Sequence, residues 1–346
     1  MPNRRVRLVL IGLGNVGRNL LRLLADKKQV LSGKYGLDLI VVGAADSAGA
    51  AMDSAGLDPA ALVSLKEQKK SVSTYIRGAR PGMGAWDLVR KSQADILVEM
   101  SLTNLTHGQP GLQCMREALG RDWDVVTANK GPLVLAYPEL MGMARGKGRQ
   151  IRFSACVGGG LPSVNVGQRD LVACTIESFE GILNSTTHYI LSAMADEGKT
   201  FDQALAEAQR IGIAEADPTL DVDGWDAANK CVILANGVLG IPATLKDVAV
   251  TGIRDVTAEQ MHAATKQDSC LKLLVKAVRE GSTYQLSVAP TLIPLTHPLA
   301  HLRGEDMGIV YRTDIMGTIT VSIAERGPVP TAAGVLRDIV AVATGH

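Results

Sequence analysis

The chain has 346 residues, of which 46% are hydrophobic but only 3% aromatic, and its 36 basic residues nearly balance 35 acidic ones. The resulting net charge of +1, without any basic run, argues against nucleic acid or an anionic membrane as a partner. The length predicts two domains. No segment approaches the roughly eighteen apolar residues of a membrane span. The five cysteines lack CxxC or framework spacing, which indicates reduced thiols in a cytoplasmic protein.

The first predicted element is an apolar strand over residues 6–11 that leads directly into a glycine loop and a helical pattern. A GxGxxG motif binds a dinucleotide when it forms the tight turn between a strand and a helix. The first two glycines allow the pyrophosphate to approach the backbone, and the third allows the helix to pack closely against the strand. The alternative is a glycine-rich turn without a ligand. The loop consists of Gly12, Leu13, Gly14, Asn15, Val16 and Gly17.

A second apolar run, residues 39–45, ends at Asp46. A carboxylate at the end of the second strand accepts a hydrogen bond from a free ribose 2′-hydroxyl and repels a 2′-phosphate. We therefore expect NAD or NADP as the cofactor, with a preference for NAD. The spacing from the glycine loop is longer than the usual distance of about twenty residues.

Two further parallel strands are predicted over residues 94–100 and 124–127, with a helix over residues 111–119 between them. Ligands of such sheets bind outside the carboxyl ends of the strands, where Ser101 and Lys130 fall. Lys130 could also be an ordinary surface lysine that closes a strand.

The fold class expected is α/β: a Rossmann-type doubly wound parallel sheet with a second α+β domain. A last strand of the first domain is predicted over residues 151–154, and the glycine run 157–162 marks the crossing to the second domain. We expect a nucleotide-binding domain over residues 1–155 and a substrate-binding and dimerisation domain over residues 156–325. An amphipathic C-terminal helix within residues 326–346 would return to the first domain.

The most informative stretch, residues 212–230, holds several carboxylates that repel one another and therefore need cations, capping contacts or water. Asp223 is predicted to cap a helix that carries Asp226 and Lys230 four residues apart, hence on one face. Such a couple suits proton transfer, although i,i+4 pairs of this kind also occur on ordinary helices. The acidic residues are Glu215, Asp217, Asp221, Asp223 and Asp226.

Residues 184–189 form a polar turn that opens a further helix and offers hydroxyls, among them that of Thr186. His188 in this turn is interpreted as a structural histidine rather than a catalytic one. No set of histidines, cysteines and carboxylates has convincing spacing for a metal site, so no metal is expected.

Taken in order, these motifs resemble homoserine dehydrogenases over nearly the whole chain, in the short monofunctional form without an aspartokinase or regulatory domain. The motifs are GxGxxG, the TANK sequence of residues 127–130, the glycine run 157–162, the LNSTT sequence of residues 183–187 and the acidic block 212–230. The resemblance implies NAD(P)-dependent interconversion of L-homoserine and L-aspartate 4-semialdehyde by hydride transfer, in a cytoplasmic homodimer.

The resemblance also assigns roles to residues. It makes Lys230 the proton donor and places Lys130 near the nicotinamide and the reacting oxygen. Substrate binding falls to Glu215, Asp226, Asp221 and Thr186, and cofactor binding to the glycine loop, Asp46, Ser101, Lys130 and Gly327.

Three departures from the family pattern leave alternatives open. Ser154 stands where the family often has a glutamate that helps to hold a monovalent cation, Ser185 and His188 replace a glycine and an asparagine, and the loop 326–331 is shortened. The substrate could therefore be another hydroxy or carbonyl compound. Aspartate-semialdehyde dehydrogenase chemistry would need a thiolate, for which Cys156 is the candidate. The third alternative is a non-catalytic dinucleotide-binding protein.

Overall fold

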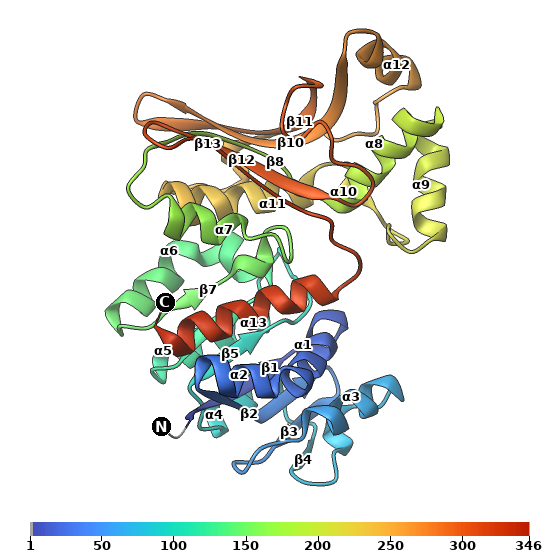
Figure 1. The fold of residues 1–346 in the computed structure, drawn as a ribbon. Helices are drawn as coiled ribbons and strands as arrows, with labels where there is room; N and C mark the ends of the chain where they lie inside the picture. The colour runs from blue at the N-terminus through green and yellow to red at the C-terminus, as the bar shows by residue number, and fades with distance from the viewer. Residues whose placement is uncertain (1–2, 346) are drawn as a thin grey trace. The chain divides into compact units, whose positions relative to one another are not determined.

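The computed structural model describes residues 3–345, which fold into two compact units (Figure 1). Unit 1 comprises Met1–Gly160 and Gly327–His346, and unit 2 comprises Leu161–Arg326. The chain therefore passes from unit 1 to unit 2 within the glycine run 157–162 and returns just before its last helix. Within the described residues, no helix is both long and apolar enough to cross a membrane.

Unit 1 is built on a seven-stranded sheet with the order β4-β3-β2-β1-β5-β6-β7. Strands β1, β2, β5, β6 and β7 are parallel, whereas β3 and β4 pair antiparallel at one edge. The direction of strand addition reverses between β1 and β5, which is the switch point where such sheets bind ligands. The strands are β1 (Arg4–Ile11), β2 (Leu37–Asp46), β3 (Gly49–Met52), β4 (Ala79–Pro81), β5 (Ile96–Glu99), β6 (Asp124–Thr127) and β7 (Ile151–Arg152).

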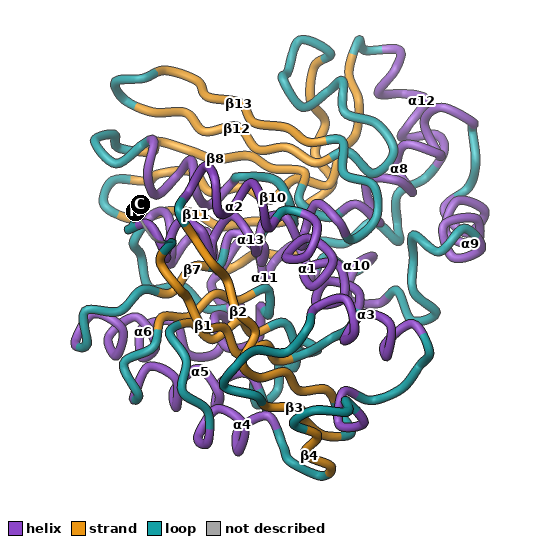
Figure 2. The backbone as a smooth tube through the Cα atoms, turned by 60° about the horizontal axis from the view of Figure 1, so that its bottom comes forward, coloured by secondary structure: helices purple, strands orange, loops and turns teal. Residues whose placement is uncertain are grey.

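Helices cover both faces of this sheet, with α1, α3 and α13 on one side and α4, α5 and α6 on the other (Figure 2). Alternate residues of β1, such as Leu8 and Leu10, join Leu20 and Ile339 in a core that involves α1 and α13. The doubly wound prediction is confirmed. The helices are α1 (Asn15–Asp26), α2 (Lys28–Tyr35), α3 (Pro59–Glu67), α4 (Ala85–Lys91), α5 (Gly111–Gly120), α6 (Lys130–Gly146) and α13 (Val329–Thr344).

Unit 2 is an α+β unit, as predicted, with a six-stranded sheet in the order β13-β12-β8-β10-β11-β9. All neighbouring strands pair antiparallel except β9 and β11, which are parallel. Gly281 has a φ of +62° in the turn between β10 and β11, a conformation that favours glycine. The strands are β8 (Ile176–Ile182), β9 (Val248–Val250), β10 (Ser269–Glu280), β11 (Thr283–Pro294), β12 (Met307–Thr313) and β13 (Gly317–Ile323).

The helices of unit 2 place the acidic block beside its sheet. Helix α11 packs against β9, β10 and β11, while α8 packs against α9, α10 and β10. The helices are α7 (Ser163–Asn165), α8 (Ser185–Glu197), α9 (Phe201–Arg210), α10 (Thr219–Val222), α11 (Trp225–Leu234) and α12 (Ala258–Lys266). Short 3₁₀ turns occur at Val72–Thr74, Ser154–Cys156 and Leu245–Asp247, and π turns at Val166–Asp170 and Ala235–Leu239.

Candidate active site

The glycine loop of unit 1 lies at the switch point, and its three glycines have different surroundings. A Cβ atom on Gly12 would lie 2.4 Å from the Met100 carbonyl oxygen, and one on Gly17 would lie 2.3 Å from the Gly12 carbonyl oxygen. These two glycines are therefore required by packing within the protein. A Cβ atom on Gly14 would meet nothing within 4 Å. The open space beside Gly14, at the start of α1, fits the approach of a pyrophosphate.

The backbone at the start of α1 also suits an anion. Gly14 is the N-cap residue, and no side chain caps the helix. The N–H groups of the first turn therefore lack a side-chain acceptor, and the helix dipole adds a partial positive charge. Within the loop, Leu13 is buried and Asn15 accepts a hydrogen bond from Arg18.

Asp46 ends β2 as predicted, but its carboxylate is already bonded within unit 1. Its Oδ2 accepts hydrogen bonds from Lys66 Nζ at 2.7 Å and from the Val72 backbone N at 3.0 Å. Its Oδ1 accepts from Ser71 Oγ at 2.7 Å and from the Ala48 backbone N at 3.0 Å. The pKa of Asp46 is lowered, because these hydrogen bonds outweigh a burial that acts to raise it. A ribose hydroxyl would compete with Lys66 for this carboxylate.

Two of the predicted residues follow the strands at the switch point. Ser101 comes two residues after β5, and its Oγ accepts a hydrogen bond from Asn129 Nδ2 at 3.3 Å. Lys130 is the first residue of α6, whose N-cap residue is Asn129. Gly327 lies instead where the chain returns to unit 1, with a φ of +68° that favours glycine.

In unit 2, four predicted or neighbouring side chains form one hydrogen-bonded cluster. Lys230 Nζ lies 2.7 Å from Asp226 Oδ2 and donates a hydrogen bond to the Leu183 carbonyl oxygen at 2.6 Å. Asn184 Nδ2 donates to Asp226 Oδ2 at 2.8 Å and to Asp221 Oδ1 at 2.7 Å. Both side chains of the Lys230–Asp226 pair are largely buried, with 12% and 15% exposed. The amide therefore bridges two carboxylates that would otherwise repel each other.

Asn184 is the member of this cluster to which sequence reasoning assigned no role. It is the N-cap residue of α8, where its Oδ1 accepts a hydrogen bond from the Thr187 backbone N at 2.9 Å. An asparagine before a run of hydroxyl residues is a recognisable capping signal. The signal locates the start of the helix, but it does not reveal that the amide reaches residues 221 and 226.

The predicted cap of α11 is wrong. Gly224, with a φ of +85°, is the N-cap residue of α11, and no side chain caps this helix. The Asp223 carboxylate instead forms an ion pair with Arg254, a partner supplied by a distant part of the chain. Asp217 accepts a hydrogen bond from the Thr219 backbone N at 3.1 Å, and hydrogen bonding to Thr219 lowers its pKa.

The two remaining substrate-side residues have different positions. Thr186 is buried in α8, and its hydroxyl donates a hydrogen bond to the Ile213 carbonyl oxygen at 3.2 Å. This contact ties α8 to the loop that leads to Glu215. The Glu215 side chain is exposed. No contact of the described residues joins it to the cluster of Asp226 and Lys230.

His188 is a buried structural residue. Its Nδ1 lies 2.8 Å from the Asp306 carbonyl oxygen and its Nε2 lies 3.0 Å from Lys272 Nζ. The carbonyl can only accept, so Nδ1 carries the proton and Nε2 accepts from the lysine. His188 and Lys272 are only 1% and 3% exposed. Burial, with the nearby lysine charge, lowers the pKa of His188 to about 3, and burial lowers that of Lys272 to about 8.

We expect this buried imidazole to make the protein sensitive to acid. Its pKa is about 3 in the folded protein against a model value of 6.5, so the unfolded chain binds the extra proton below pH 6.5. Stability is therefore fully present above that pH and is lost as the pH falls, by about 2 kcal/mol at pH 5. Urea unfolding of the parent and His188→Asn at pH 7 and pH 5 tests this. The parent should lose more stability than the variant, and equal losses would contradict the assignment.

Ser154, the residue that departs from the family pattern, is held by the last helix. Its backbone N and its Oγ each donate a hydrogen bond of 2.8 Å to the buried carboxylate of Asp338. Arg337 donates to Ser154 Oγ at 2.9 Å and to the Gly160 carbonyl oxygen at 3.2 Å. A guanidinium and a carboxylate from α13 therefore bond the segment where the resemblance placed a cation ligand. Residues 3–345 contain no group of three or more His, Cys, Asp or Glu side chains that could hold a metal ion.

Cys156, the candidate nucleophile of the alternative chemistry, is only 2% exposed. Its Sγ lies 3.4 Å from the Thr127 carbonyl oxygen. Reactive cysteines are usually at least partly exposed and activated by neighbouring positive charge. A buried thiol bonded to a backbone carbonyl does not fit a nucleophile.

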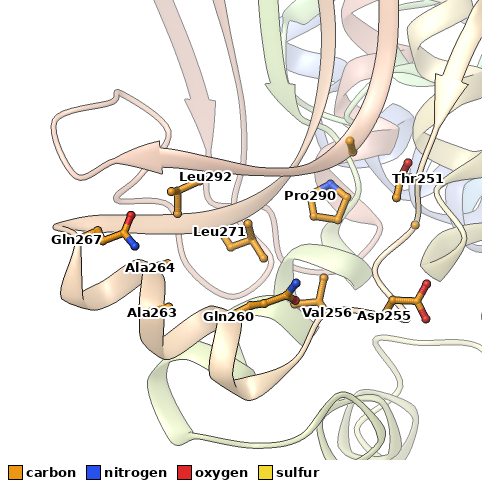
Figure 3. A pocket seen from close by; sticks show the side chains of 12 residues that line it. Thr251, Asp255, Val256, Gln260, Ala263, Ala264, Gln267, Leu271, Pro290 and Leu292 are labelled. Carbon is orange, nitrogen blue, oxygen red and sulfur yellow. The ribbon is translucent and has the colours of Figure 1, made fainter.

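A pocket of about 560 Å³ lies in unit 2 between α12 and strands β10 and β11 (Figure 3). Its walls are largely apolar, with Leu271, Pro290 and Leu292 on the strands and Ala263 and Ala264 on the helix. None of the predicted site residues lines it. The pocket is therefore distinct from the cluster around Lys230.

A glycine loop at the switch point of a doubly wound sheet is typical of dinucleotide-binding proteins, and the largely buried lysine–carboxylate pair of unit 2 suits proton transfer. Together they indicate an NAD(P)-dependent dehydrogenase. The family described as "Homoserine dehydrogenase, NAD binding domain" matches residues 12–154, and "Homoserine dehydrogenase" matches residues 162–340. The chain belongs to the homoserine dehydrogenase family, whose members are NAD(P)-dependent oxidoreductases acting on a CH–OH group.

Individual relatives agree with this assignment. Homoserine dehydrogenase of Methanocaldococcus jannaschii is 38% identical over 96% of this chain and 97% of its own length. The NAD(+)-dependent homoserine dehydrogenase of Pseudomonas canavaninivorans is 34% identical over 96% and 95%. The crystal structure of a putative homoserine dehydrogenase from Archaeoglobus fulgidus superimposes with a TM-score of 0.88 at 36% identity, covering 97% of this chain and 99% of that one.

Proposed function

We propose that this protein catalyses the NAD(P)-dependent interconversion of L-homoserine and L-aspartate 4-semialdehyde. The observation that carries the proposal is the hydrogen-bonded cluster of Asn184, Asp221, Asp226 and Lys230, in a chain that also has a dinucleotide loop and belongs to this family. The cluster combines a proton donor with carboxylates that suit an ammonium group, and homoserine carries an ammonium on the same short chain as its reacting alcohol.

Lys230 is proposed as the acid–base group. The bound nicotinamide supplies a hydride to the aldehyde carbon in reduction and accepts one in oxidation. Lys230 gives a proton to the aldehyde oxygen in reduction and takes it back from the alcohol in oxidation, so that aldehyde, reduced cofactor and one proton yield alcohol and oxidised cofactor. Asp226, 2.7 Å from Lys230 Nζ, orients the amine and offsets its charge.

The other residues are proposed to bind and orient. Asp221 and Asp226 form a negatively charged lining that suits the substrate ammonium, and Glu215 adds a third carboxylate from its exposed position. Thr186 supports the loop that carries Glu215. On the cofactor side, the loop from Gly12 to Gly17 and Ser101 hold the dinucleotide. Lys130 contributes a positive charge there for the negative charge that develops during transfer.

The preference for NAD over NADP stays a prediction. Asp46 still places a carboxylate at the end of β2, but Lys66 pairs with it at 2.7 Å and reduces its repulsion of a 2′-phosphate. A hyperthermophilic archaeal homoserine dehydrogenase in complex with NADPH matches this fold with a TM-score of 0.85 at 28% identity, covering 99% of both chains. We therefore propose that this protein accepts both cofactors and favours NAD.

We further propose that the protein works as a homodimer in the cytoplasm. Two-fold dimers are the commonest assembly of soluble enzymes. All five cysteines are free thiols, which suits a reducing compartment. Light scattering of the purified protein would give the mass of a dimer, whereas the mass of one chain would contradict this part of the proposal.

A substrate screen tests the proposed reaction. The protein is offered L-homoserine, L-serine, L-malate and simple alcohols, each with NAD and with NADP, and the absorbance of the reduced nicotinamide is followed. We expect turnover with L-homoserine to exceed that with every other compound. Faster turnover with a different hydroxy compound would favour the alternative of another substrate within the family, and the absence of turnover with any compound would favour a non-catalytic role.

A further inference from the structure

A buried glutamate at the switch point has no role in the reaction described so far. Glu99 is the last residue of β5, and its side chain is 0% exposed. Its Oε1 accepts a hydrogen bond from the Ser101 backbone N at 2.9 Å. Within residues 3–345, its buried Oε2 has no hydrogen-bond partner. Burial of the carboxyl group raises the pKa of Glu99.

The carboxyl group of Glu99 lies against the start of α5. A Cβ atom on Gly111, the first residue of α5, would lie 2.8 Å from both Glu99 Oε2 and Asn129 Nδ2. Real Cβ atoms do not approach other heavy atoms so closely, so only glycine fits at residue 111 in this arrangement. Glu99, Asn129 and the first turn of α5 are therefore packed directly together.

The Glu99 carboxyl group is linked to the start of α6 through Ser101 and Asn129. Asn129 is 1% exposed, and its Nδ2 donates to Ser101 Oγ at 3.3 Å while its Oδ1 accepts from the Gly131 backbone N at 3.0 Å. A Cβ atom on Gly131 would lie 2.6 Å from the Asn104 carbonyl oxygen, so the loop after β5 packs on the first turn of α6. Lys130 lies between Asn129 and Gly131, both of which contact the loop that follows β5.

Stability alone does not account for a carboxyl group at this place. Removing a carboxyl group from water costs free energy that its hydrogen bonds must offset, and well-packed apolar residues often replace buried ionic groups without loss of stability. A buried polar group can instead specify one arrangement of the elements around it. Because solvent does not reach Glu99, it also cannot touch a cofactor or substrate directly.

We propose that Glu99 is a positioning residue that acts through Ser101 and Asn129 to fix Lys130 on the cofactor side of the site. The inference rests on the proposed function of Lys130. Glu99 sets where the first turn of α6 begins, and with it where the lysine presents its charge. Gly111 is part of the same arrangement, because it leaves the space that the carboxyl group fills.

The test compares turnover of Glu99→Gln with that of the parent, in the parental and in the Lys130→Ala background. The substitution keeps an acceptor for Ser101 but places a donor beside Asn129 Nδ2, which should displace Asn129. We expect turnover to fall about tenfold to a hundredfold, the scale of a misplaced catalytic group, with the Michaelis constant for homoserine and the melting temperature nearly unchanged. In the Lys130→Ala background, the same substitution should have little further effect, because residues that act as a unit are not additive.

Glu139→Gln is the matched control. Glu139 also lies in α6 and pairs with Arg116 of α5, but both side chains are about half exposed, at 47% and 42%. The control removes a carboxylate between the same two helices at the surface, and it should keep parental turnover. If Glu99→Gln does not fold, Gly111→Ala disturbs the same contact from the other side and should show the same dependence on Lys130.

Each outcome decides between the inference and the proposed function. Parental turnover in Glu99→Gln and in Gly111→Ala, together with an impaired Lys130→Ala enzyme, would overturn the inference and leave the proposed role of Lys130 intact. Losses that add fully in the double variant would also overturn it, since Glu99 would then act elsewhere. Parental turnover in Lys130→Ala would refute the proposed role of Lys130 and the inference with it.

Discussion

Lys230→Ala should lower turnover with homoserine by about two to four orders of magnitude while the fold and the affinity for the cofactor persist. The amine is the only donor in the cluster of unit 2 that can release a proton, and it is held at 2.7 Å from Asp226 and 2.6 Å from the Leu183 carbonyl oxygen. Lys230→Arg should recover little activity, because a guanidinium keeps its charge near neutral pH and cannot donate the proton. Steady-state kinetics with saturating cofactor measure the effect.

Lys276→Ala is the matched control for this prediction. Lys276 is also a lysine of unit 2, and it forms an ion pair of 3.1 Å with Glu180 on the sheet. It should keep turnover near that of the parent. If Lys230 only stabilises α11 through its i,i+4 pair, Lys230→Ala and Lys276→Ala should behave alike. A Lys230→Ala enzyme within about threefold of the parent would contradict the acid–base role.

Asp226→Asn should lower kcat/KM for homoserine by about a hundredfold or more, with effects on both turnover and the Michaelis constant. The Asp226 carboxylate accepts from Lys230 and from Asn184, and we propose that it also faces the substrate ammonium. Its loss leaves the largely buried amine without its counter-charge, and an amide NH₂ would meet the donor of Asn184. The two constants are measured separately with the same cofactor concentration.

Asp223→Asn provides the comparison. Asp223 belongs to the same acidic block but pairs with Arg254 instead of Lys230. Its substitution should change kcat/KM little. Equal losses in Asp226→Asn and Asp223→Asn would indicate a general effect of charge in the block, and they would contradict a specific role for Asp226.

The local features of the site could be predicted from the sequence. The glycine loop between a strand and a helix, the end of β2 at Asp46 and the four-residue spacing of Asp226 and Lys230 all depend on residues close together in the chain. Local periodicity and turn chemistry determine such features. The structure accordingly places Asp226 and Lys230 in contact on one face of α11.

The features that were missed depend on residues far apart in the chain. The cap predicted for Asp223 was wrong because Arg254 pairs with it, and no local pattern reveals that partner. Asn184 reaches Asp221 and Asp226 only once α8, α10 and α11 have packed. In the sequence, Glu99 is a charged residue near the end of a predicted strand, and nothing local indicates that it is buried. Its burial follows from the packing of α5 and α6, which begin more than ten residues later.

Most strands of unit 2 were also not identified in advance. Strands β10 and β11 are twelve residues each, and each mixes buried and exposed positions without strict alternation. Their pairing with each other and with β8 makes them strands, and β8 lies almost a hundred residues earlier. Propensity is weak evidence for a strand, because the contacts across the sheet contribute most of its stability.

The most direct test of the proposed function is to measure the product formed from L-aspartate 4-semialdehyde. The protein is incubated with this aldehyde and NADH or NADPH, and the L-homoserine formed is quantified together with the reduced cofactor consumed. We predict equimolar homoserine formation and cofactor oxidation, independent of phosphate, and abolished almost completely by Lys230→Ala. Cofactor oxidation without homoserine, or no oxidation by the parent protein, would contradict the proposed function.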